Sequence, residues 1–94
     1  MNNKNIWITG ASSGIGKALA IKFSQEGWNV AISARREELL KEIAKTNKNI
    51  NVFPLDVTDS EKCKSVFQNI LQEMGDINIS VFSTGIHDPK SERE

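Results

Sequence analysis

Two hydrophobic periods alternate along this chain. Short apolar runs predict strands, and longer segments with apolar residues three or four positions apart predict helices. The predicted strands are residues 4–9, 28–34, 50–55 and 77–83. The predicted helices are residues 14–26, residues 37–46 and a third segment that ends at Gly75. Strand and helix therefore alternate from the first element to the last.

Each predicted helix has one apolar face. The face of the first helix comprises Ile15, Ala18, Leu19 and Phe23. The face of the second comprises Leu39, Leu40, Ile43 and Ala44. The face of the third comprises Cys63, Val66, Phe67, Ile70, Leu71 and Met74. Gly27 is expected to stop the first helix, while Thr58 is expected to cap the third and Glu61 to complete a capping box with it.

Repeated strand–helix units with short connections predict a parallel sheet with right-handed crossovers. We therefore expect an α/β fold, Rossmann-like with three α/β/α layers, and the strand order 3-2-1-4. Residues 1–85 are expected to form a nucleotide-binding half-domain, and the polar residues 86–94 a frayed tail. Ligands of such sheets bind at the carboxyl ends of the strands, where the strand order reverses.

The composition excludes several classes of protein. Of the 94 residues, 12 are Lys or Arg and 12 are Asp or Glu, so charge favours neither nucleic acid nor an anionic membrane as a partner. No apolar run is long enough to span a bilayer, and the first residues lack the apolar core of a signal peptide. Cys63 is the only cysteine, which argues against a disulfide framework or a zinc cluster. A cytoplasmic location is the default expectation.

A glycine-rich turn follows the first strand directly: Thr9-Gly10-Ala11-Ser12-Ser13-Gly14-Ile15-Gly16. A strand that stops at glycines and restarts as a helix directs unpaired N–H groups into one crevice, at the positive end of the helix dipole. This arrangement predicts a phosphate or pyrophosphate site, although a glycine turn alone can be purely structural. The spacing is not the common G-x-G-x-x-G fingerprint, and no Gly-Lys-Ser/Thr follows as in a P-loop.

The end of the second strand is basic. An acidic residue here would hydrogen-bond the ribose 2′-hydroxyl of NAD, whereas arginine accommodates the 2′-phosphate of NADP. Ala34 leaves the acid out, and Arg35 offers a charged fork that matches phosphate. The arginines can instead pair with Glu37 or Glu38 in solvent, and either role is open to Arg36.

Asp56 follows the third strand, in Leu55-Asp56-Val57. Its place at the carboxyl end of a strand puts it beside the crevice, where its carboxylate could accept a hydrogen bond from an adenine amino group. The alternative is a polar residue that merely precedes the helix cap.

Together, the glycine turn, the basic end of strand two and Leu55-Asp56-Val57 resemble the cofactor signature of the classical short-chain dehydrogenase/reductase family. The resemblance covers the chain to about Gly85. It implies that Ser12 and Ser13 lie near the adenosine ribose and its phosphate, and that Ile15 donates a backbone N–H to the pyrophosphate. It also implies that Asp56 and Val57 hold the adenine and that Arg35 selects NADP(H) over NAD(H).

The sequence departs from the family pattern in two places. The family ends strand four with Asn-Asn-Ala-Gly, where this chain has Phe82-Ser83-Thr84-Gly85. Gly85 can still let the cofactor approach, and Ser83 is a shorter polar residue than asparagine. The chain also has no tyrosine, so the family's catalytic serine and Tyr-x-x-x-Lys are not assigned and no catalytic residue is predicted. The lone His87 is expected to be a solvated loop residue.

The leading hypothesis is that the chain is the N-terminal, NADP(H)-binding portion of an oxidoreductase, as a truncated gene product, a relic or an expressed fragment. The complete enzyme would transfer hydride between nicotinamide and a carbonyl or alcohol, and the 94 residues alone would be inactive. The alternative is a stand-alone nucleotide-binding or regulatory module. It would be completed by pairing the exposed edge of strand four with another chain, including a second copy.

Overall fold

A computed structural model describes residues 4–12 and 14–82 of the chain. Its sheet consists of four strands, which are β1 (Asn5–Thr9), β2 (Asn29–Ser33), β3 (Ile50–Val52) and β4 (Ile79–Phe82). All paired strands are parallel and the order is β3-β2-β1-β4. The predicted α/β class and strand order are therefore confirmed.

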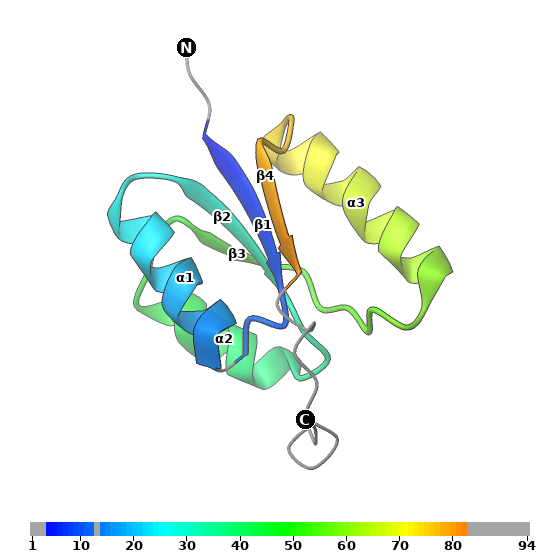
Figure 1. The fold of residues 1–94 in the computed structure, drawn as a ribbon, viewed down its shortest axis with the longest axis horizontal. Coiled ribbons are helices and arrows are strands. Elements are labelled where there is room, and N and C mark those ends of the chain that lie inside the picture. The colour runs from blue at the N-terminus through cyan, green and yellow to red at the C-terminus, as the bar shows by residue number, and fades with distance from the viewer. Residues whose placement is uncertain (1–3, 13, 83–94) are drawn as a thin grey trace.

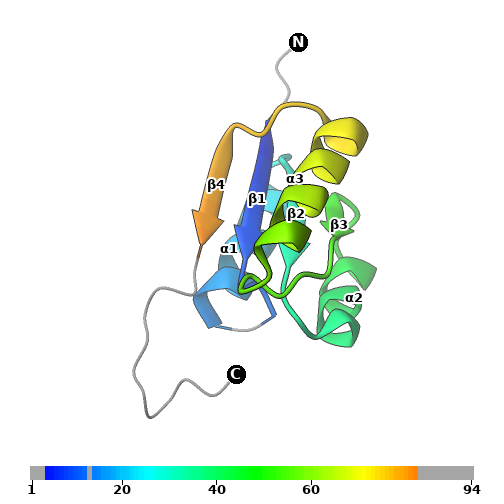
Figure 2. The same ribbon diagram turned by 90° about the vertical axis from the view of Figure 1, so that its right-hand side faces the viewer.

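Three helices complete the layers: α1 (Gly14–Gln25), α2 (Glu37–Lys45) and α3 (Ser60–Met74). Helices α1 and α2 cover one face of the sheet, and α3 lies on the other (Figures 1 and 2). Because the strands are parallel, their carboxyl ends meet at one edge of the sheet, and the loops that precede the three helices all leave from that edge.

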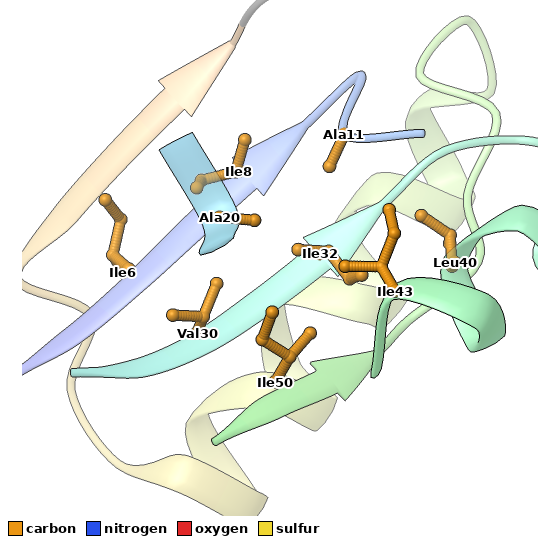
Figure 3. Packing of buried hydrophobic residues seen from close by; sticks show 9 residues of the cluster. All are labelled: Ile6, Ile8, Ala11, Ala20, Val30, Ile32, Leu40, Ile43 and Ile50. Carbon is orange, nitrogen blue, oxygen red and sulfur yellow. The ribbon is translucent and has the colours of Figure 1, made fainter. Parts of the chain in front are cut away.

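Each face of the sheet has its own hydrophobic cluster. The cluster beneath α1 and α2 is shown in Figure 3, and its buried members are Ile6, Ile8, Ala11, Ala20, Val30, Ile32, Leu40, Ile43 and Ile50. The cluster beneath α3 contains Trp7, Ala31, Phe53, Leu55, Val66 and Ile70. Successive residues of β1 and β2 feed opposite clusters, since side chains alternate across a sheet.

The face that α1 turns to the sheet differs from the predicted one. Its buried residues are Gly16, Ala20 and Ser24, four positions apart, whereas Ile15 is 67% exposed and Ala18 is also exposed. Small residues allow the helix to approach the strands closely, and a pattern of apolar residues does not single out positions such as Gly16 and Ser24. The remaining predicted members, Leu19 and Phe23, pack against the cluster from its margin.

The start of α3 is also corrected. The N-cap is Asp59, whose Oδ1 accepts the backbone N–H of Lys62 at 3.1 Å, so Thr58 does not cap the helix. The C-terminal prediction is confirmed, because Gly75 ends α3 with a φ of 94°.

Strand β3 ends three residues earlier than predicted, at Val52. Its hydrogen bonding to β2 nevertheless continues, because Phe53 N donates to Ile32 O at 2.9 Å and Leu55 N donates to Ala34 O at 3.0 Å. The segment after β3 therefore stays alongside the end of β2.

Asn5 joins the amino end of β1 to the carboxyl end of α3 and to the segment that leads into β4. It is fully buried, and its Nδ2 donates to the carbonyls of Met74 at 2.9 Å and Asp76 at 2.8 Å. Its backbone N–H donates to Asn78 Oδ1 at 2.8 Å. These bonds anchor the connection from α3 to β4 beneath β1.

Strand β4 lies at the edge of the sheet, as expected. Within residues 4–12 and 14–82 it pairs only with β1, and Phe82 at its end is 61% exposed. No helix in the described part of the chain has the length and apolar character that crossing a membrane requires.

Candidate nucleotide-binding site

The turn after β1 crosses the end of β2. Backbone N–H groups of Gly10 and Ala11 both donate to the carbonyl of Ser33, at 2.8 and 3.2 Å. Gly10 has a φ of 70°, in the left-handed region where glycine avoids a steric penalty. This bifurcated bond fixes the turn against β2 and directs the following residues toward the start of α1.

Gly14 begins α1 with a φ of 60°, and no atom of the described residues would lie within 4 Å of a side chain added there. In the part of the chain that the structure describes, the backbone at this point therefore borders space that a ligand can enter. The first N–H groups of any helix lack intrahelical partners, and the helix dipole makes this end positive. Ser12 is half-buried beside it, and Ile15 extends into solvent. The predicted site residue Ser13 lies outside the described residues.

The two arginines lie at the connection between β2 and α2. Both side chains are exposed. Arg36 is the N-cap residue of α2 through its backbone, without a side-chain cap bond, and its carbonyl accepts the N–H of Leu39 at 3.1 Å. Arg35 precedes it and lies two positions after Ser33, which anchors the glycine turn.

Asp56 lies next to Arg35, because the bond from Leu55 N to Ala34 O aligns the two segments. Its Oδ1 accepts the hydroxyl of Thr58 at 2.7 Å and the backbone N–H of Thr58 at 3.0 Å. These two bonds, together with the positive charge of Arg35, lower the pKa of the Asp56 carboxyl. The site therefore places an ionised, solvent-facing carboxylate beside an arginine.

A hollow of about 500 Å³ extends from Val57 across the α3 face of the sheet. Its aromatic lining is Trp7, Phe67 and Phe82. The ring of Trp7 lies 6.2 Å from that of Phe67 and 6.1 Å from that of Phe82. Trp7 Nε1 also donates to the buried hydroxyl of Ser33 at 2.9 Å, which ties this wall to the end of β2.

The structure thus brings the glycine turn, Arg35 and Asp56 to one edge of the sheet. Ser83, Gly85 and His87 lie outside the described residues, as does the predicted tail of residues 86–94.

Residues 4–94 match the family model described as short chain dehydrogenase. That match covers nearly all of the sequence. The chain belongs to the short-chain dehydrogenase family.

Relatives and solved structures agree with this assignment. "Dehydrogenase/reductase SDR family member 7" of Mus musculus is 39% identical over 88 residues, which cover 85% of this chain and 26% of the relative. A short-chain dehydrogenase of Streptomyces avermitilis superposes with a TM-score of 0.79 at 32% identity, over 85% of this chain and 30% of that one. The 3-ketoacyl-(acyl-carrier-protein) reductase of Brucella melitensis, solved with NADH, superposes with a TM-score of 0.78 at 24% identity, over 82% of this chain and 32% of that one. At that identity the likeness concerns the fold alone.

This short-chain dehydrogenase chain therefore spans about a quarter of the length of its mouse relative.

The roles of two residues at the site were not predicted from the sequence. Thr58 was assigned as the cap of the helix, although an aspartate side chain commonly accepts the backbone N–H two residues on. Ser33 carried no sequence signal, because its role depends on Trp7 from another strand.

Proposed function

We propose that this chain binds NADP(H) as the cofactor-binding half-domain, residues 1–85, of a short-chain dehydrogenase oxidoreductase. One observation carries the proposal: Arg35 and Asp56 stand side by side, next to the glycine turn that begins α1. Arg35 can then bind a phosphate group and Asp56 an amino group of the same ligand.

The residues present fit a dinucleotide. The open space beside Gly14 and the amino end of α1 suit a pyrophosphate, with the N–H of Ile15 as a donor. Ser12, Ser13, Gly10 and Gly16 would shape the turn around the adenosine ribose. Arg35, with Arg36 as a second candidate, would hold a 2′-phosphate, because Ala34 supplies no acid for a ribose 2′-hydroxyl.

The remaining proposed contacts concern the base. The Asp56 carboxylate would accept the adenine amino group and Val57 would hold the ring, while Ser83 and Gly85 would follow from β4. In a complete enzyme the bound cofactor supplies the hydride and the protein supplies orientation and proton transfer. The 94 residues contain no tyrosine that could act as the family's general acid. We therefore propose that the chain alone binds cofactor without turnover.

Calorimetry with the full chain tests the cofactor preference. We expect NADPH to bind more tightly than NADH, and Arg35→Ala to weaken NADPH binding roughly tenfold or more, since a charge-assisted hydrogen bond contributes about 1.5–3 kcal/mol. NADH binding should change little. Lys45→Ala, which removes an equal charge from the far end of α2, is the matched control. Equal affinity for both cofactors in the wild type would refute the NADP(H) assignment.

A second candidate function is a binding or regulatory module that another chain completes. The observation that favours it is the edge strand β4, with Ile79 39% and Phe82 61% exposed. Exposed apolar strand edges are templates for pairing.

The cytoplasmic location stays a prediction.

A further inference from the structure

We propose that Thr58 is a positioning residue for adenine recognition: its N–H and hydroxyl hold Oδ1 of Asp56 and leave Oδ2 to accept the amino group of the base. This inference rests on the proposed function, because it assumes that Asp56 faces the adenine.

The geometry at Asp56 is specific to one carboxylate oxygen. The Thr58 hydroxyl lies 2.7 Å from Oδ1 and the Thr58 N–H lies 3.0 Å from the same atom. Two donors from one residue restrict rotation of the carboxylate about its terminal bond. An ionised carboxylate only accepts hydrogen bonds, so the second oxygen remains an acceptor with a defined direction.

The hydroxyl of Thr58 is committed to this task because another residue caps α3. Asp59 accepts the N–H of Lys62 at 3.1 Å as the N-cap. Asp59 N in turn donates to the backbone carbonyl of Asp56 at 2.9 Å. Both the main chain and the side chain of Asp56 are therefore held by the residues that follow it, before α3 begins.

This arrangement distinguishes adenine from hypoxanthine. Adenine carries an amino donor at the position where hypoxanthine carries a keto oxygen, and a keto oxygen facing a fixed carboxylate leaves both acceptors without a proton. The two bonds from Thr58 lower the pKa of the Asp56 carboxyl, and Arg35 acts in the same direction. The carboxylate, already ionised at neutral pH, therefore stays ionised further into the acid range. A protonated carboxyl would discriminate less, because it can also donate. A freely rotating carboxylate would discriminate less as well, because neither oxygen would have a fixed direction toward the base.

The test compares NADPH with its hypoxanthine analogue, using the full chain and calorimetry. We expect the wild type to favour the adenine form about tenfold or more. Thr58→Ser keeps the hydroxyl and should keep this ratio. Thr58→Val keeps the shape of the side chain but removes the hydroxyl. It should lose most of the preference for NADPH over the hypoxanthine analogue, mainly because it binds NADPH more weakly. Thr58→Ala is the second removal variant, and Thr46→Val at the end of α2 is the control for an exposed threonine.

Three results overturn the proposal. They are an unchanged adenine preference in Thr58→Val and Thr58→Ala, a lost preference in Thr58→Ser, or no adenine preference in the wild type. Failure of the wild type to bind either dinucleotide would refute the proposed function as well, which separates the two failures. Titration of the Asp56 carboxyl by NMR gives a readout without ligand: its pKa should rise in Thr58→Val and stay low in Thr58→Ser.

Discussion

The pKa of the Asp56 carboxyl is set below its ordinary value by its neighbours, because the side chain faces solvent and burial opposes ionisation only weakly. The Thr58 bonds act first and Arg35 adds to them. A carboxyl whose pKa is lower in the folded chain stabilises the fold above its ordinary pKa, near 3.8, and this stabilisation is lost as the pH falls through the lower folded value. Neighbouring groups therefore lower the pH at which the carboxylate charge of the proposed site is lost.

Asp56→Asn should remove this contribution. In urea unfolding of the wild type, the free energy of unfolding should fall more steeply below about pH 4 than it does in Asp56→Asn. At neutral pH the variant should be less stable than the wild type. Parallel pH profiles for the two proteins would show that the carboxylate carries no such linkage.

At the scale of single residues, chemistry was easier to predict than geometry. Arg35 and Asp56 were assigned to the crevice because residues at the carboxyl ends of parallel strands must meet there. The prediction that Thr58 caps α3 was wrong. Two residues that can cap a helix, Thr58 and Asp59, follow one another, and the sequence pattern alone does not decide between them. The cofactor contacts themselves stay predictions.

Helix α1 shows how the inward face of an element can be predicted only in part, because Leu19 and Phe23 pack against the cluster while Ile15 and Ala18 are exposed. Gly16, Ala20 and Ser24 lie against the sheet, and a search for large apolar residues overlooks such positions. Close packing of a helix on strands depends on small side chains at the contact. The apolar faces of α2 and α3 were predicted better, since Leu40, Ile43, Val66 and Ile70 are all buried as expected.

The corrected face of α1 can be tested with two substitutions in the same helix. Ala20 is fully buried in the cluster, so Ala20→Leu should destabilise the fold by about 1–3 kcal/mol through overpacking. Ala18 is exposed, so Ala18→Leu should change the free energy of unfolding by no more than about 0.5 kcal/mol. Urea unfolding measures both. The reverse ranking would restore the face predicted from the sequence.

For the molecule as a whole, the strand order could be predicted because short crossovers between parallel strands permit few topologies. The exposed edge at β4 follows from that order. The strand order could not predict the aromatic contacts that Trp7 of β1 makes with Phe67 of α3 and Phe82 of β4. These contacts depend on the packing of α3 and β4 on β1.

We propose that this edge supports association between copies of the chain, and Phe82 offers the test. Covering a phenylalanine contributes about 1.5–3 kcal/mol, so Phe82→Lys should weaken self-association roughly tenfold to a hundredfold. Sedimentation velocity over a range of concentrations measures this. Gln72→Lys adds the same charge to exposed α3 and should leave association unchanged. A wild type that stays monomeric at every concentration would contradict the proposal.

The most direct test of the central claim is an NMR titration of the 94-residue chain with NADPH. The account predicts saturable shifts of the amide signals in residues 10–16 and at Arg35, Asp56 and Val57. The amide signals of residues at the amino ends of the strands, such as Asn29 and Ile50, should not shift. Shifts confined to those amino ends, or no saturable shift at all, would contradict the claim that this chain holds a dinucleotide.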